Sequence, residues 1–291
     1  MKVFLALPGN ERLARWLAVQ TGGAFCGLRT RRFPDGETYV RLGRAVLGDE
    51  VYAVCTLAHP DRRTLRLLLA AGAARDAGAR RVVLVAPYLA YMRQDRAFAE
   101  GEAISARHFA RLLSHAFEGL VTVDPHLHRI RALGEIFDIP ARALHAAPLL
   151  ADWVRVNVER PLLIGPDVES RQWVEAVAHR AAAPFAVLTK VRRADRQVEI
   201  ELPALATFSG RQPVLIDDII SSGTTMIQAA RMLRAAGVGR PVCLAVHGLF
   251  AQDSFERLSA LAATVVTTDS VPHPSNGISI ARMLADGLSG I

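Results

Sequence analysis

The chain has 291 residues, half of them apolar, which is enough for two domains with cores of their own. No apolar run approaches the roughly 20 residues that span a bilayer, so we expect neither a membrane anchor nor a signal peptide. Three scattered cysteines, Cys26, Cys55 and Cys243, predict a reducing cytoplasm. The net charge is +7 without a basic tail or stripe, so small polyanionic substrates are favoured over nucleic acid, and no membrane partner is expected.

Strand-like and helical runs alternate along the whole chain. Strands are expected at 3–7, 51–56, 82–86, 120–123, 162–164, 185–188, 214–216, 242–246 and 264–266. Helices are expected between them, for example at 10–21, 61–77, 105–116 and 170–182. This alternation predicts an α/β protein with two doubly wound, mostly parallel sheets, divided into domains near residue 145. Functional residues should then follow the carboxyl ends of strands.

Two segments of the first half carry polar residues in suggestive places. Residues 32–42 contain a Pro-Asp-Gly turn between two extended pieces and predict a hairpin, which could be a surface hairpin without a function. Residues 93–96, Arg-Gln-Asp-Arg, follow the strand at 82–86. Arg93, Gln94 and Arg96 offer forked donors that suit a triphosphate and a purine edge, although a solvated charged loop is the alternative.

Candidate metal ligands follow two other strands. Asp124, His126 and His128 are close enough in sequence to suggest a metal site, but a histidine at a strand end is more often packed or hydrogen-bonded. Mg²⁺ prefers carboxylate, water and phosphate oxygens to imidazole. Asp167 lies in a strand-to-helix loop, where Ser170 could cap the helix.

The segment 213–234 contains a short buried strand, two aspartates, a Ser-Ser-Gly-Thr-Thr loop and a helix. Hydroxyls and backbone N–H groups at a helix start can wrap a phosphate. Asp217 and Asp218 would repel that phosphate, but their carboxylates suit the two hydroxyls of a ribose. Solvated acids beside a Ser/Thr helix cap explain the same spacing equally well. A Walker A loop is excluded because no Gly-Lys-Ser/Thr is present.

The run Asp-Asp-Ile-Ile-Ser-Ser-Gly at 217–223 resembles the ribose-phosphate loop of the type I phosphoribosyltransferase fold, and most of all the phosphoribosyl diphosphate (PRPP) synthetase, or ribose-phosphate diphosphokinase, family. Similar motifs stand in the family's order along essentially the whole chain, at 32–37, 87–96, 124–126, 166–167 and 190–192. Family glycines are replaced by Ala90, Glu169, Ser170 and Thr224, which indicates a divergent member.

The resemblance implies an oligomeric enzyme, at least a dimer, that uses Mg²⁺ to transfer diphosphate from ATP to the 1-hydroxyl of ribose 5-phosphate. It implies two domains, 1–145 on the ATP side and 146–276 on the ribose 5-phosphate side, with a C-terminal helix within 277–291 that packs on the first. It assigns catalysis to Lys190 and Arg192 and metal binding to His126 and Asp167. The implied ATP-binding residues are Phe33, Asp35 and Glu37, from a neighbouring subunit, and Arg93, Gln94, Asp95 and Arg96. The implied ribose 5-phosphate-binding residues are Asp217, Asp218, Ser221, Ser222, Gly223, Thr224 and Thr225.

The sequence is compatible with two alternative functions. A phosphoribosyltransferase that consumes PRPP would share the ribose loop but would not need the segments at 32–37 and 93–96. A regulatory subunit without turnover is kept open by the replaced glycines at Glu169 and Ser170.

Overall fold

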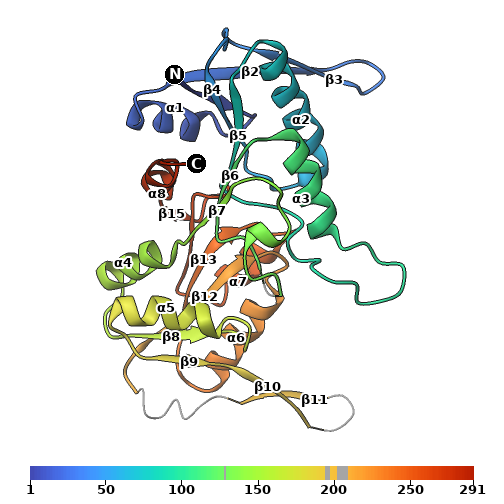
Figure 1. Ribbon diagram of the computed structural model, residues 1–291. Coiled ribbons are helices and arrows are strands. Elements are labelled where there is room, and N and C mark those ends of the chain that lie inside the picture. Colours follow the sequence, from blue (N-terminus) through green and yellow to red (C-terminus); the bar gives the residue numbers. More distant parts are fainter. Residues whose placement is uncertain (128, 194–196, 202–208) are drawn as a thin grey trace. The chain divides into compact units, whose positions relative to one another are not determined.

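The computed structural model describes residues 1–127, 129–193, 197–201 and 209–291, with the backbone alone for 189–193 and 197–201 (Figure 1). The chain divides into two compact units. The first contains Met1–Leu144 and Ala281–Ile291, and the second contains His145–Ile280. None of the described helices is long and apolar enough to cross a membrane.

The first unit is built on a seven-stranded sheet in the order β3-β2-β1-β4-β5-β6-β7. Neighbouring strands are parallel except β2 and β3, which form an antiparallel hairpin. The strands are β1 (Lys2–Ala6), β2 (Ala24–Arg32), β3 (Thr38–Leu42), β4 (Glu50–Val54), β5 (Arg81–Ala86), β6 (Leu120–Val123) and β7 (Ala141–Leu144). The helices are α1 (Glu11–Gln20), α2 (Pro60–Asp76), α3 (Ser105–Ala116) and α8 (Ala281–Gly287), with a 3₁₀ turn at Leu133–Glu135.

Helices cover both faces of this sheet. In Figure 1, α1 and α8 lie on one side of the strands and α2 and α3 on the other. The central strands are therefore apolar on both faces, and residues 82–86 of β5 are fully buried. The C-terminal segment is attached by arginines: Arg142 donates to the carbonyls of Gly287 and Ser289, both at 2.7 Å, and Arg81 donates to the carbonyl of Ile291 at 2.6 Å.

The second unit has a six-stranded, all-parallel sheet in the order β15-β14-β13-β12-β8-β9. Its strands are β8 (Pro161–Gly165), β9 (Phe185–Val187), β12 (Gln212–Ile220), β13 (Val242–Gly248), β14 (Thr264–Thr268) and β15 (Asn276–Ile278). Its helices are α4 (Ala147–Asn157), α5 (Arg171–Ala181), α6 (Thr224–Ala235) and α7 (Ser254–Ser259). A separate antiparallel ribbon joins β10 (Thr189–Arg193) to β11 (Gln197–Glu201).

The expected fold class, α/β with two mostly parallel sheets, is confirmed, and three local expectations are corrected. The strand expected at 214–216 continues to Ile220, because its second half pairs with β13. The helix expected from residue 277 begins at Ala281, because the Asn276 side chain donates to Thr267 Oγ1 (2.9 Å) and to the carbonyls of Thr268 (2.7 Å) and Val271 (3.1 Å), which fixes 276–278 as a strand. No strand was expected at 189–193 or 197–201, where the chain forms the antiparallel β10–β11 ribbon.

Candidate active site

The loop between β12 and α6 has the shape of an anion cradle. Gly223 occupies the position before the helix with φ of 69°, a conformation that side chains other than glycine rarely adopt. A Cβ there would also lie 3.3 Å from both Ile227 Cδ1 and Ser254 Cβ, so space is short as well. The chain turns sharply at this glycine, and the first backbone N–H groups of α6 have no partner within the helix.

Hydroxyl groups lie beside these N–H groups, and Ser222 Oγ accepts the backbone N–H of Thr224 at 3.5 Å. Ser222 Oγ and Thr224 Oγ1 lie 3.1 Å apart on the exposed rim of the loop. The loop is held from behind, since the Ser221 carbonyl accepts bonds from Ala251 N at 2.9 Å and from Ser254 Oγ at 3.0 Å. The hydroxyls and the helix N-terminus together suit a phosphate group. Ser254 is a supporting residue that sequence reasoning missed, because it comes from α7, beyond the next strand.

Carboxylates gather beside the cradle. Asp217 and Asp218 lie in β12, and the backbone N–H of Asp218 donates to Asp217 Oδ1 at 3.0 Å. Burial raises the pKa of Asp217 well above its usual value, and the negative charges of Asp218 and Asp167 raise it further. Asp218 and Asp167 are thus close enough to Asp217 to disfavour its ionised form. Hydroxyl donors or a cation would relieve that repulsion.

Asp167 follows β8 and organises the start of α5. Its Oδ1 accepts the backbone N–H groups of Glu169 at 3.1 Å and Ser170 at 3.2 Å. Ser170 stands at the N-cap position of α5, as suggested, but its hydroxyl donates to the Asp167 carbonyl at 2.6 Å and makes no capping bond to the helix. Ser170 has φ of −76°, and Glu169 is likewise outside the positive-φ region. The two replaced glycines therefore cause no backbone strain.

In the first unit, the loop after β5 presents Arg93 to solvent. Gln94 is held inside the loop, with its amide donating to the Arg96 carbonyl at 3.2 Å and to Glu102 Oε2 at 3.1 Å. The Arg96 guanidinium lies over the exposed ring of Phe98, 4.6 Å from its centroid. Among the described residues Arg93 and Arg96 form no ion pair, so both are available to an anionic ligand.

Asp95 has an internal partner. Its carboxylate is buried and accepts the backbone N–H of Arg129 at 3.1 Å and the Arg129 guanidinium at 2.9 Å. Burial alone would raise the pKa of Asp95, but the hydrogen bonds and charge of Arg129 outweigh it and hold the pKa below its usual value. This pair ties the loop after β5 to the loop after β6, which carries the half-buried His126. The sequence pattern did not predict this ion pair between Arg129 and Asp95.

The β2–β3 hairpin is confirmed, with an exposed tip. Phe33 N donates to the Glu37 carbonyl at 2.8 Å, and Glu37 N donates to Asp35 Oδ1 at 3.1 Å. The Arg31 guanidinium lies 4.5 Å from the Phe33 ring centroid. Within the described residues, no hydrogen bond or ion pair joins this tip to Arg93 or the residues after it.

Other site predictions fall on less fully described parts of the chain. Lys190 and Arg192 lie in β10, where their backbones pair with Ile200 and Val198 of β11, and their side chains are outside the described part. His128 lies outside the described residues altogether. The two predicted metal ligands belong to different units, His126 to the first and Asp167 to the second.

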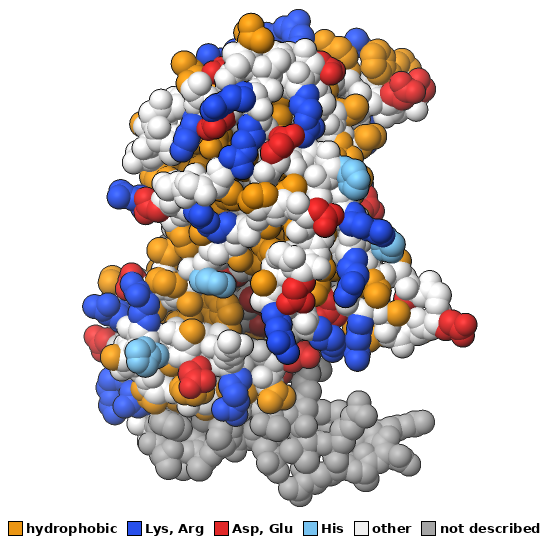
Figure 2. All heavy atoms as spheres, viewed as in Figure 1, with side chains coloured by type: hydrophobic (Ala, Val, Ile, Leu, Met, Phe, Trp, Pro, Cys, Tyr) orange, Lys and Arg blue, Asp and Glu red, His pale blue; other side chains and the backbone are white. Residues whose placement is uncertain are grey.

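No group of three or more His, Cys, Asp or Glu side chains in the described part of the chain is arranged to hold a metal ion. Mg²⁺ usually keeps several waters and takes one or two protein carboxylates together with substrate phosphates. On the face drawn in Figure 2, Lys and Arg side chains are interspersed with Asp and Glu side chains, and the described residues there form no continuous basic stripe.

The parallel sheets and the strand–loop–helix cradle define a protein of the phosphoribosyltransferase-fold class, and comparisons with known proteins agree. Residues 132–270 match the phosphoribosyl transferase domain, and residues 1–116 match the N-terminal domain of ribose phosphate pyrophosphokinase. The chain is 34% identical to a ribose-phosphate pyrophosphokinase of Methanopyrus kandleri, over 99% of both chains. It is 33% identical to that of Thermococcus kodakarensis, over 90% of this chain and 92% of the relative.

A solved structure agrees as well. The crystal structure of phosphoribosylpyrophosphate synthetase from Mycobacterium smegmatis is similar, with a TM-score of 0.86 and 26% identity, over 98% of this chain and 97% of that one. The chain belongs to the ribose-phosphate pyrophosphokinase family, which confirms the resemblance seen in its motifs.

Proposed function

We propose that the protein transfers the β,γ-diphosphoryl group of ATP to the 1-hydroxyl of ribose 5-phosphate, giving PRPP and AMP. The ribose oxygen forms a bond to the β-phosphorus, the bond from that phosphorus to the α,β-bridging oxygen breaks, and the hydroxyl proton is lost. The observation that carries the proposal is the pair of adjacent carboxylates, Asp217 and Asp218, next to the loop that turns at Gly223 into the start of α6.

The second unit is proposed to bind ribose 5-phosphate. The ring hydroxyls would donate to Asp217 and Asp218, which replaces charge repulsion by hydrogen bonds. The 5-phosphate would occupy the cradle formed by Ser221, Ser222, Gly223, Thr224 and Thr225, at the positive end of α6. The printed names of the relatives, ribose-phosphate pyrophosphokinases, support this assignment.

The first unit is proposed to bind ATP. Arg93 and Arg96 are exposed cations suited to the phosphates, and Gln94 suits the purine edge. Asp95 is proposed to hold the ATP-binding loop in position and not to contact ATP, because its carboxylate is already bonded to Arg129. Phe33, Asp35 and Glu37 would serve the ATP site of a neighbouring subunit, which makes the active form at least a dimer. The exposed position of the hairpin tip supports this sharing.

The acids of the second unit fit Mg²⁺, because the charges of Asp218 and Asp167 already raise the pKa of Asp217 and a cation would relieve that repulsion. Asp167 in the second unit and His126 in the first are each proposed to help bind Mg²⁺, which when bound would supply neutralising charge for the phosphates. Lys190 and Arg192 are proposed to stabilise the charge that develops on the transferring group. We place the reaction in the cytoplasm, which the three buried, unpaired thiols of Cys26, Cys55 and Cys243 support.

The test is a steady-state comparison of the wild type with the double variant Asp217→Ala, Asp218→Ala. Loss of the two acceptors should raise KM for ribose 5-phosphate by about 100-fold or more, since hydrogen bonds to charged groups are each worth about 1.5–3 kcal/mol, while KM for ATP stays close to wild type. Unchanged KM values for both substrates would overturn the proposed ribose site.

A further inference from the structure

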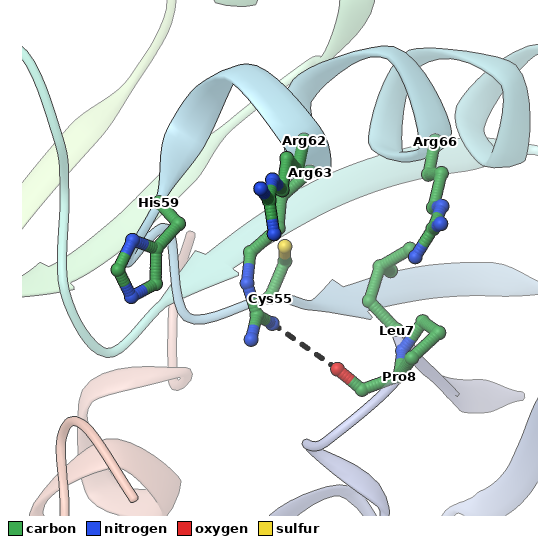
Figure 3. A pocket seen from close by; sticks show the side chains of 7 residues that line it. All are labelled: Leu7, Pro8, Cys55, His59, Arg62, Arg63 and Arg66. Carbon is green, nitrogen blue, oxygen red and sulfur yellow. Dashed lines mark hydrogen bonds between the residues drawn. The ribbon is translucent and has the colours of Figure 1, made fainter.

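A second candidate site lies in the first unit and is lined by none of the residues assigned above. It is a pocket of about 260 Å³ whose wall is formed by the ends of two strands and the start of one helix (Figure 3). The lining residues are Leu7, Pro8, Cys55, His59, Arg62, Arg63 and Arg66.

The position of the pocket follows from the topology of the sheet. Leu7 and Pro8 follow β1, and Cys55 follows its neighbour β4. From β1 the chain continues through α1 to β2 on one side, whereas from β4 it continues through α2 to β5 on the other. The two helices lie on opposite faces of the sheet (Figure 1), which opens a crevice between the two strand ends. Crevices at this reversal of strand order are where open α/β sheets bind ligands.

The pocket is strongly positive. Arg62, Arg63 and Arg66 lie in the first two turns of α2, a 17-residue helix whose N-terminus adds its own partial positive charge. None of these three forms an ion pair with another described residue. Arg63 donates to the Pro8 carbonyl at 3.1 Å, which fixes its guanidinium across the pocket, as Figure 3 shows. Three guanidinium groups around one small cavity therefore have no anion of the protein to neutralise them within the described structure.

In the described structure the nearby acidic groups form no ion pair with these arginines, and each accepts a hydrogen bond from another group. Asp61, the one acid in the first turn of α2, accepts the hydroxyl of Tyr91, and Glu11 accepts the backbone N–H of Gly9 at 3.0 Å. The Cys55 thiol stays neutral, because burial raises its pKa to about 12 and the charge of Arg63 offsets this rise only in part. No side chain that lines the pocket carries a negative charge.

We propose that this pocket binds a compact polyanion, with diphosphate preferred over phosphate. Each guanidinium group presents two parallel N–H donors, which can bind two phosphoryl oxygens at once. The combined charge of +3 matches the charge of diphosphate better than that of a single phosphate. The cavity is smaller than the roughly 300–1,000 Å³ of sites for drug-sized ligands, which favours a free anion over a whole nucleotide.

The experiment is isothermal titration of the full chain with inorganic diphosphate, and separately with inorganic phosphate, in Mg²⁺-free buffer at constant ionic strength. The main variant is Arg62→Gln with Arg66→Gln, which keeps the structural bond from Arg63 to Pro8. The control is Arg231→Gln with Arg234→Gln, which removes two exposed arginines from another helix, α6. A third variant, Ser222→Ala with Thr225→Val, disables the cradle of the candidate active site.

Loss of two charged donors should weaken diphosphate binding by about 100-fold, roughly tenfold for each arginine. The control and the cradle variant should each retain this binding event, and phosphate should bind more weakly than diphosphate to the wild type. If the double variant fails to fold, the single variant Arg62→Gln, at an exposed position, should still weaken diphosphate binding by about tenfold.

Wild-type affinity in the Arg62/Arg66 variant would overturn the proposal, as would an equal loss in the Arg231/Arg234 control, which would indicate a bulk charge effect. Loss confined to the cradle variant would place the anion in the candidate active site instead. Because no ATP or ribose 5-phosphate is present, failure here leaves the proposed reaction untouched.

Discussion

Replacing Arg129 should destabilise the first unit more than replacing its partner Asp95. The two residues form one ion pair, but the Asp95 side chain is 1% exposed and the Arg129 side chain is 48% exposed. In Arg129→Ala the carboxylate remains buried without a partner. In Asp95→Asn the guanidinium can turn to water, and an amide oxygen of the same shape can still accept a hydrogen bond.

The magnitudes follow from this asymmetry. An uncompensated buried charge typically costs about 3–5 kcal/mol of unfolding free energy, which we expect for Arg129→Ala. Loss of a charge-assisted hydrogen bond costs about 1.5–3 kcal/mol, which we expect for Asp95→Asn. Because Arg129 lowers the pKa of Asp95, the stabilisation is present above the unfolded-state pKa of about 3.9 and is lost as pH falls through the lower folded value.

Urea unfolding of both variants at pH 7 measures the difference. Arg155→Ala is the matched control, because its pair with Asp152 is exposed on both sides (61% and 54%) and should contribute no more than about 1 kcal/mol. Equal losses for the two variants, or a larger loss for Asp95→Asn, would refute the reasoning. A stable Asp95→Asn protein with a greatly raised KM for ATP would instead mean that Asp95 contacts the nucleotide.

Three further predictions concern the proposed site. Burial and neighbouring charges raise the pKa of Asp217, so its ionisation lowers the stability of the folded protein as pH rises above the unfolded-state pKa. The Asp217→Asn variant should therefore have a higher unfolding free energy than the wild type at pH 8 and the same one near pH 3. The same variant should bind ribose 5-phosphate more weakly. An urea titration at the two pH values decides this, and lower stability at pH 8 would contradict it. His126→Ala should shift the Mg²⁺ dependence of activity to higher concentration, whereas a lower melting temperature with an unchanged Mg²⁺ titration would indicate a packing role. Lys190→Arg should lower kcat by about 100- to 1,000-fold with little change in either KM, because a compact ammonium can follow the developing charge and a planar guanidinium cannot. The control variant Arg193→Lys should have nearly wild-type kinetics. A near-normal kcat in Lys190→Arg would show that this lysine takes no part in catalysis.

The sequence predicted the features that depend on local pattern. Alternating apolar strands and helices predicted the parallel sheets, and the Pro-Asp-Gly turn predicted the β2–β3 hairpin. The length of β12 was underestimated because Asp217 and Asp218 are polar, and their place in the strand comes from pairing with β13. The short strand at 276–278 was missed because it is fixed by the Asn276 side chain, which bonds to Thr267, Thr268 and Val271, five to nine residues earlier in the chain.

The features that were missed at the site depend on tertiary contacts. Arg129 is 34 residues from Asp95, and no periodicity connects them. The arginine pocket required the strand order, which places the ends of β1 and β4 side by side although nearly 50 residues separate them. Arg62, Arg63 and Arg66 taken alone are indistinguishable from a solvated helix face.

The most direct measurement follows the phosphorus atoms of ATP. The protein is incubated with ribose 5-phosphate, Mg²⁺ and ATP labelled at either the β- or the α-phosphorus. The β label should appear in PRPP and the α label in AMP, in equal amounts and only when ribose 5-phosphate is present. Formation of ADP, or release of AMP that does not depend on ribose 5-phosphate, would contradict diphosphoryl transfer.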